Sequence, residues 1–190
     1  MIPLLQEPSG SPARQTPPRR PGREPLRWQA LQLVLFLALP GMASAAPSLL
    51  DFRLGDIRSG EVRSLQEFQG QRTFLVFFEP ECPWCVKQMR ALEELGEQCP
   101  ERFRTVTVGV HGNLPAYRRL LRVAGTDQPA FTASDRLVAA IGGVTATPYT
   151  LFLDARGQPT HRLQGYIPAP EMRVWLAEQG VRCRRPQTGG

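Results

Sequence analysis

The chain has 190 residues, of which 42% are hydrophobic, and a formal net charge of +6. This length suffices for one domain with a hydrophobic core and an additional terminal segment. Five of the 23 basic residues and two of the 17 acidic residues lie within residues 1–45, so the remainder carries a charge of only +3. A surface this weakly basic argues against a nucleic-acid-binding protein.

Residues 1–45 have the organisation of a secretory signal peptide. Arg27 precedes a short apolar run over 30–39, and a stretch of small residues suited to cleavage ends at Ala45. We therefore predict that a domain spanning 46–190 is exported to the periplasm or another extracytoplasmic compartment. The alternative is an uncleaved membrane anchor, although the apolar run is shorter than the ~20 residues that span a bilayer.

Hydrophobic patterning predicts alternating strands and helices after this segment. Residues 49–54 alternate as expected for an edge strand, and residues 64–68 form a predicted helical turn that begins at a Ser cap. Residues 73–78 are continuously apolar, β-branched or aromatic, which is typical of a strand covered on both faces. Apolar residues then recur at helical spacing from Val86 to Leu95 and predict an amphipathic helix.

The second half of the domain continues this alternation. Its predicted elements are a strand over 104–110, a helix over 114–124, a short strand within 128–134, a short helix over 135–141, a hairpin over 150–153 and 160–166, and a last helix that starts near Pro168 and Pro170. This order of elements predicts an α/β sandwich around one mixed sheet.

Two cysteines in a Cys-Pro-Trp-Cys motif lie where the strand over 73–78 gives way to the amphipathic helix. The N–H groups at a helix N-terminus stabilise a thiolate, which is the reactive form of cysteine. We therefore predict that Cys82 is an exposed nucleophile and that Cys85, one turn further, is a buried resolving cysteine. Pro83 stiffens the turn at a position where its missing N–H is not needed.

Other interpretations of this cysteine pair stay open at the level of sequence. A structural disulfide with so short a loop would constrain the unfolded chain little. A zinc site needs further ligands, and the remaining candidates lack pair spacing: Cys99, His111, His161 and Cys183. Inert thiols fit poorly with export to an oxidising compartment. A copper carrier is the alternative function, since soft thiolates suit Cu(I).

Further motifs accompany the cysteine pair. These are Ser64-Leu65, Phe68 and Gly70 before the strand over 74–78, and Thr147-Pro148, Asp154, Gly157 and Gly165 after the cysteines. Together with Cys-X-X-Cys, the pattern resembles the TlpA/redoxin branch of the thioredoxin superfamily over residues 49–179. The resemblance implies a thioredoxin-like three-layer α/β sandwich with a central mixed β-sheet.

The resemblance also implies site residues and an activity. Pro148 should be cis and face the disulfide, Thr147-Pro148 should pair with a substrate chain, and we assign Pro83 and Trp84 to the same binding surface. The expected activity is thiol–disulfide exchange with protein clients, more as a reductase than as an oxidant. Because the cysteines carry the chemistry themselves, we expect no organic cofactor and no metal. We further expect a monomer that a membrane redox partner resets.

The chain departs from its relatives near the cysteines. Relatives often carry an acid where Val76 stands and Glu where Gln88 stands, and both groups assist proton transfer in those relatives. Glu81 replaces the usual Trp before the first cysteine. Glu79 and Glu81 either lie close enough to disfavour the Cys82 thiolate or form a solvated rim. The sequence therefore identifies no general base.

Two further cysteines follow helices that, in the thioredoxin fold, share one face of the sheet. Cys99 comes just after the active-site helix, and Cys183 just after the last helix. Because both helices run away from the active site, their ends are expected to meet. We predict a structural Cys99–Cys183 disulfide, with two unpaired thiols as the alternative.

Overall fold

The computed structural model describes residues 48–99 and 103–184, which belong to one compact unit spanning 45–190. The predicted signal segment lies outside the described residues. Within the described part of the chain, no helix combines the length and the apolarity needed to cross a membrane.

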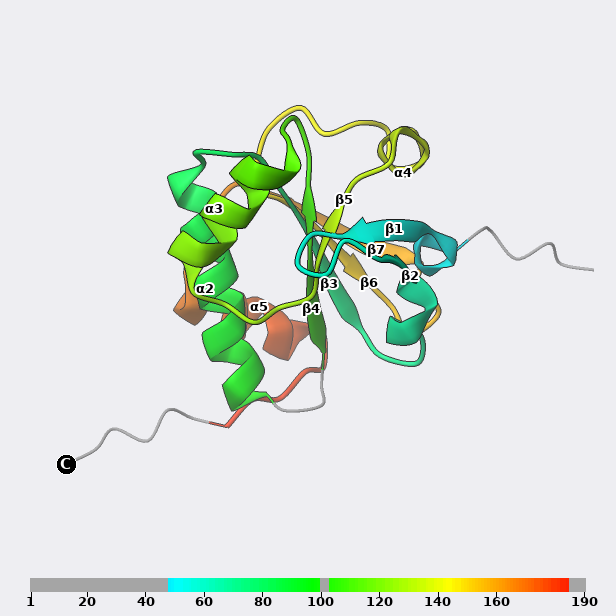
Figure 1. The fold of residues 1–190 in the computed structure, drawn as a ribbon. Coiled ribbons are helices and arrows are strands. Elements are labelled where there is room, and N and C mark those ends of the chain that lie inside the picture. The colour runs from blue at the N-terminus through cyan, green and yellow to red at the C-terminus, as the bar shows by residue number, and fades with distance from the viewer. Residues whose placement is uncertain (1–47, 100–102, 185–190) are drawn as a thin grey trace, which may run out of the picture. The chain divides into compact units, whose positions relative to one another are not determined.

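The described residues form a seven-stranded mixed sheet in the order β2-β1-β5-β4-β3-β6-β7 (Figure 1). Neighbours β3 and β4 are parallel, as are β4 and β5, and the other neighbouring pairs are antiparallel. The strands are β1 (Arg53–Asp56), β2 (Val62–Ser64), β3 (Thr73–Phe78), β4 (Arg104–Gly109), β5 (Ala130–Thr132), β6 (Tyr149–Leu153) and β7 (Pro159–Gln164). The predicted hairpin is confirmed as β6 and β7.

Helices cover both faces of the sheet, which confirms the predicted three-layer sandwich. Figure 1 shows α2, α3 and α5 on one side and α4 on the other. The helices are α2 (Pro83–Gln98), α3 (Leu114–Ala124), α4 (Asp135–Ala140) and α5 (Ala169–Glu178), with short 3-10 turns η1 (Leu49–Asp51) and η2 (Leu65–Phe68).

Strand β3 lies at the centre of the core, and every one of its residues is buried. Because side chains alternate across a strand, Phe74 and Val76 pack beneath α2 and α5, whereas Leu75 and Phe77 pack toward α4 and the 3-10 turns. The continuous apolar run therefore has the explanation expected from the sequence, a strand covered on both faces. The rigid end of this strand carries the loop that leads to Cys82.

The predicted edge strand over 49–54 is wrong in two respects. Residues 49–51 form η1, because the Ser48 side chain accepts a hydrogen bond from Leu50 N and caps a helical turn. The strand proper begins at Arg53 and is not an edge, because β2 pairs with its outer side. Strand β2 was not predicted, because it has only three residues, which are partly exposed and show no hydrophobic alternation.

Candidate active site

The cysteine pair sits at the N-terminus of α2, directly after the loop that leaves β3. Cys82 is the N-cap residue, and its Sγ accepts a hydrogen bond from the backbone N–H of Cys85 at 3.1 Å. Pro83 occupies the first turn, where a missing N–H costs nothing. Cys82 and Cys85 form a disulfide, with Cα atoms 5.2 Å apart. The helix terminus thus directs an N–H group at the sulfur that would carry negative charge after reduction.

The two sulfur-bearing residues differ less in exposure than the sequence suggests. Cys85 is completely buried, and Cys82 is only 8% exposed rather than an open nucleophile. Cys82 is covered because it packs in a cluster with Phe78, Tyr117 and Leu120. It nevertheless borders a surface hollow of about 400 Å³, whose other lining residues are Pro80, Glu81, Pro83, Val86, Ala116, Arg119, Leu120 and Val123. Access to Cys82 is therefore through a mostly apolar hollow.

The Thr147-Pro148 segment lies beside Cys82 and lines a different hollow from the one described above. The Thr147–Pro148 peptide bond is cis, and the Thr147 hydroxyl lies 3.7 Å from Cys82 Sγ. A second hollow, of about 340 Å³, is lined by Trp84, Thr147, Pro148, Gly165 and Tyr166. The structure thus brings together Cys82, Trp84, Thr147 and Pro148, although they come from segments more than 60 residues apart in sequence.

Trp84 is a large aromatic side chain held at the surface of this site. It is 52% exposed, and its ring stacks on that of Tyr166 with centroids 5.8 Å apart. The Lys87 ammonium lies 4.2 Å from the centroid of the Trp84 ring, which is a favourable cation–π distance. These contacts fix an exposed indole beside the second hollow, where a bound chain could cover it.

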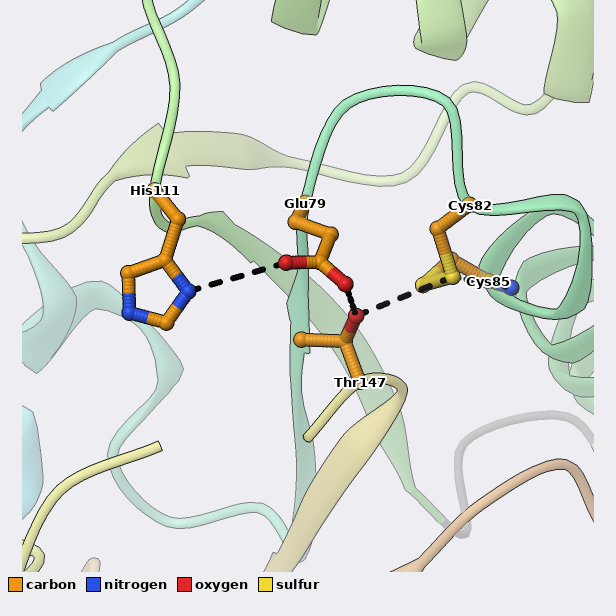
Figure 2. The surroundings of a disulfide bond; sticks show 5 residues. All are labelled: Glu79, Cys82, Cys85, His111 and Thr147. Atoms are coloured by element: carbon orange, nitrogen blue, oxygen red, sulfur yellow. Dashed lines mark hydrogen bonds and ion pairs between the residues drawn. A yellow bond between two sulfur atoms is a disulfide. The ribbon is translucent and has the colours of Figure 1, made fainter. Parts of the chain in front are cut away.

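Two further residues complete the site (Figure 2): Glu79, which the sequence left either close to Cys82 or on a solvated rim, and His111, which it considered only as a zinc ligand. One carboxylate oxygen of Glu79 accepts a hydrogen bond from the Thr147 hydroxyl at 2.8 Å, and the other lies 3.7 Å from His111 Nδ1. Glu79 follows β3, and His111 follows the parallel neighbour β4. Because the carboxyl ends of parallel strands meet at one edge, this placement is the signal that could have found both residues.

Tyr117 supports the loop that carries His111. Burial raises the pKa of Tyr117, although its hydroxyl accepts a hydrogen bond from the backbone N–H of Gly112 at 2.9 Å, which acts in the opposite direction. The ring packs edge-on against Phe78 at the end of β3. Tyr117 therefore remains a neutral phenol that ties the loop after β4 to the base of the site.

The thioredoxin-like domain model matches residues 64–180. The chain belongs to this family. Solved structures of the same fold include a secreted Mycobacterium tuberculosis disulfide oxidoreductase homologous to E. coli DsbE, at 20% identity and a TM-score of 0.58 over 68% of this chain and 97% of that one. A search of curated proteins gives no match to this chain.

Two further solved structures show the same fold. A thiol:disulfide interchange protein of the thioredoxin family from Chlorobium tepidum is 21% identical, with a TM-score of 0.60 over 72% of this chain and 98% of that chain. A DsbF homologue from Corynebacterium diphtheriae is 19% identical, with a TM-score of 0.59 over 70% and 86% of the two chains. The predicted membership of the thioredoxin superfamily is confirmed, and likeness at these identities establishes the fold.

This thioredoxin-like domain has no acidic side chain at residues 76 and 88, the two positions where the family resemblance leads us to expect one. Val76 lies in the core. Gln88, one turn beyond Cys85, is completely buried, and its Oε1 accepts a hydrogen bond from the backbone N–H of Ile167 at 2.8 Å. The Gln88 amide nitrogen has no hydrogen-bond partner within the described residues. Glu79 is therefore the carboxylate connected to Cys82 through a hydrogen-bonding group.

The second cysteine pair lies at the far end of α2 from the site. Cys99, which ends the helix, forms a disulfide with Cys183, and the backbone N–H of Arg184 donates to Gln98 O at 2.9 Å. At 1.5 Å per residue, the 16 residues of α2 separate the two disulfides by about 24 Å. This distance favours a structural role for the Cys99–Cys183 bond over a relay of electrons from Cys82.

The other potential metal ligands stay apart. Among residues 48–99 and 103–184, no three His, Cys, Asp or Glu side chains gather closely enough to hold a metal ion. His161 belongs to β7, and its ring contacts that of Trp175 in α5. His111 instead follows β4, near the cysteine pair.

Proposed function

We propose that this chain is an exported thiol–disulfide oxidoreductase that exchanges the Cys82–Cys85 disulfide with protein thiols. One observation carries the proposal: the disulfide lies at the N-terminus of α2, with the Thr147 hydroxyl 3.7 Å from Cys82 Sγ and hollows on both sides. A disulfide with only a structural purpose needs neither a helix terminus nor a surface on which a second chain can lie.

A client can reach Cys82 Sγ but not Cys85, which is completely buried, so the exchange begins at Cys82. A client thiolate attacks Cys82 Sγ, and the Cys82–Cys85 bond breaks with its electron pair moving to Cys85 Sγ, which solvent then protonates. A second client thiolate attacks the client sulfur of this mixed disulfide and releases Cys82 as a thiolate. The client dithiol is oxidised and the protein disulfide is reduced. Reductase action is the reverse sequence, with Cys82 as the attacking thiolate.

The two hollows suggest how a client lies across the site. Pro80, Pro83 and Val86 make the first hollow mostly apolar, while Trp84 and Pro148 form part of the second. A client with apolar side chains on either side of its cysteine would bury them while its sulfur meets Cys82. Pro83, Trp84, Thr147 and Pro148 are therefore proposed as substrate-binding residues.

The proposal also covers the export of the protein, the direction of electron transfer and the redox partner. The signal-like pattern of residues 1–45 supports export of a domain spanning 46–190, and one protein of the same fold is described as secreted. The TlpA/redoxin resemblance favours a reductase. In an oxidising compartment a reductase must itself be reduced again, so we propose a membrane redox partner as its electron source. A single chain contains the whole site, which is consistent with a monomer.

Trapping of the mixed disulfide tests the activity. Cys85→Ser removes the resolving sulfur, so reduced full-length protein should form a stable Cys82-linked adduct with oxidised insulin, seen on non-reducing gels and mapped by mass spectrometry. The matched control, Cys82→Ser, leaves the more buried Cys85 and should form little adduct. The proposal fails if no adduct forms and the wild-type protein neither reduces insulin nor oxidises a model dithiol.

The reduction potential of the Cys82–Cys85 couple tests the direction. Equilibration with glutathione buffers, followed by alkylation and mass mapping of these two residues, gives the potential without a client. A value near the ~ −270 mV of thioredoxin supports the reductase, whereas one near the ~ −120 mV of DsbA would make the protein an oxidant.

A further inference from the structure

The Thr147 hydroxyl has one hydrogen and two acceptors within reach. Glu79 Oε1 lies 2.8 Å from the hydroxyl oxygen, and Cys82 Sγ lies 3.7 Å from it on the other side (Figure 2). A disulfide sulfur is a weak acceptor, whereas a carboxylate forms a short charge-assisted bond. In the disulfide state the hydrogen therefore points to Glu79.

Reduction changes this competition. Cys82 then carries either a thiol or a thiolate, and a thiolate is a charged acceptor that would attract the same hydrogen. As long as Glu79 holds the hydroxyl, the thiolate lacks this donor and also lies near a second negative charge. Both effects disfavour the thiolate, and hence the reduced form of the pair.

We propose that Glu79 is a positioning residue that withholds the Thr147 hydroxyl from Cys82 and thereby makes the reduced cysteine pair a stronger reductant. This inference rests on the proposed redox function of Cys82 and Cys85. It assigns Glu79, rather than a buried acid beneath the disulfide, as the carboxylate that adjusts the site. It also supplies a physical reason for the reductase direction.

The other charged groups around the site set the background for this effect. His111, from the loop after β4, faces the second oxygen of Glu79 at 3.7 Å, with side-chain exposures of 54% for His111 and 43% for Glu79. Glu81 from the same loop as Glu79 and Arg119 from α3 both line the hollow beside Cys82, and Lys87 of α2 lies over Trp84. Of these groups, Glu79 is the one hydrogen-bonded to Thr147 in the described structure.

A double-mutant cycle separates the hydrogen bond from the charge. Glu79→Gln removes the charge and weakens the hold on the hydroxyl, and the test repeats this change in a Thr147→Val background, where no hydroxyl exists. Glu81→Gln is the matched control, because it removes a carboxylate in the same loop that has no bond to Thr147. The readout is the pH dependence of Cys82 alkylation in the reduced full-length protein, mapped by mass spectrometry.

With Thr147 present, Glu79→Gln should lower the midpoint of Cys82 ionisation by roughly half to one pH unit. It should also shift the glutathione equilibrium by about threefold to tenfold toward the reduced pair. In the Thr147→Val background the shift in midpoint should fall to less than about half, since only the charge remains. Glu81→Gln should give the same shift in both backgrounds.

A second variant keeps the test decisive if Thr147→Val does not fold. Glu79→Asp retains the charge but draws the carboxylate away from Thr147, so it should reproduce much of the Glu79→Gln shift. The inference is overturned if Glu79→Asp behaves as the wild type, or if Glu79→Gln gives equal shifts with and without the hydroxyl. Both readouts use small thiol reagents and need no protein client. If the expected shifts appear but the protein exchanges disulfides with no client, only the proposed function is rejected and the inference about Glu79 stands.

Discussion

Cys99, at the end of α2, is bonded to Cys183, which follows α5, and their Cα atoms lie 4.3 Å apart. The two residues are 84 positions apart in sequence, so the bond closes a loop that contains β4 through α5. Cys99 is buried at the base of the core cluster that α2 and α5 share. The bond therefore ties together the far ends of two helices on one face of the sheet.

Replacing both of these cysteines should reduce stability and leave exchange intact. For a loop of this length, the chain-entropy model gives a loss of about 4.6 kcal/mol in the free energy of unfolding for the Cys99→Ala/Cys183→Ala variant. Denaturant unfolding of the oxidised proteins measures this loss, and insulin reduction measures the exchange. A folded variant without exchange activity, or a loss below about 1 kcal/mol, would contradict the structural role.

Asp56 is a buried carboxylate whose ionisation should support the fold above acidic pH. Burial raises the pKa of Asp56, but hydrogen bonds from Ser59 N, the Arg63 guanidinium and Arg58 N outweigh it and hold the pKa below the ordinary value of a carboxyl group. The folded state therefore binds this proton less readily than the unfolded state. The resulting stabilisation is present above the ordinary carboxyl pKa and is lost as the pH falls through the lowered value.

Asp56→Asn should lower the free energy of unfolding by about 1–3 kcal/mol at neutral pH, because the amide oxygen can still accept from Arg58 N and Ser59 N, but the amide nitrogen cannot accept from the Arg63 guanidinium. It should also flatten the loss of stability on acidification, measured by urea unfolding across a pH series. Glu61→Gln, an exposed carboxylate of the same hairpin, should change stability by less than about 0.5 kcal/mol. Unaltered acid dependence in Asp56→Asn would contradict this account.

Gln88 offers a test of why an acid is missing beneath the disulfide. Gln88→Glu would place a carboxyl in a completely buried site with one donor, the Ile167 N–H, so burial should raise the pKa of the introduced group. A raised folded-state pKa gives full stability below the ordinary carboxyl pKa and a loss as the pH rises through the raised value. We expect a loss of about 1–3 kcal/mol at neutral pH, growing from acid to neutral conditions.

Thermal unfolding followed from acidic to neutral pH measures this loss. Gln69→Glu, at an exposed position, serves as the control and should show no such trend. If Gln88→Glu were as stable at neutral pH as at acidic pH, the site would have to supply donors or water that its described contacts lack.

Local sequence patterns predicted most of the architecture, and they failed where pairing is decided at a distance. Strand β3 and helix α2 were predictable because their apolar residues repeat with the period of the element that buries them. Strand β2 was not, because three polar or exposed residues become a strand only when β1 offers its free edge. The predicted strand over residues 49–54 failed at its start for a similar reason, because the Ser48 cap makes residues 49–51 helical.

The sequence by itself determined the cysteine motif at the strand–helix junction, and the family resemblance added the Thr147-Pro148 segment opposite it. Only the tertiary structure decided that Glu79 reaches Thr147, 68 residues away, and that Cys82 is nearly covered. The physical reason is that the hydrophobic pattern of a segment shows only which of its faces is buried in the core. The carboxyl ends of separate strands meet only after the sheet has formed, and a hydrogen bond depends on that meeting.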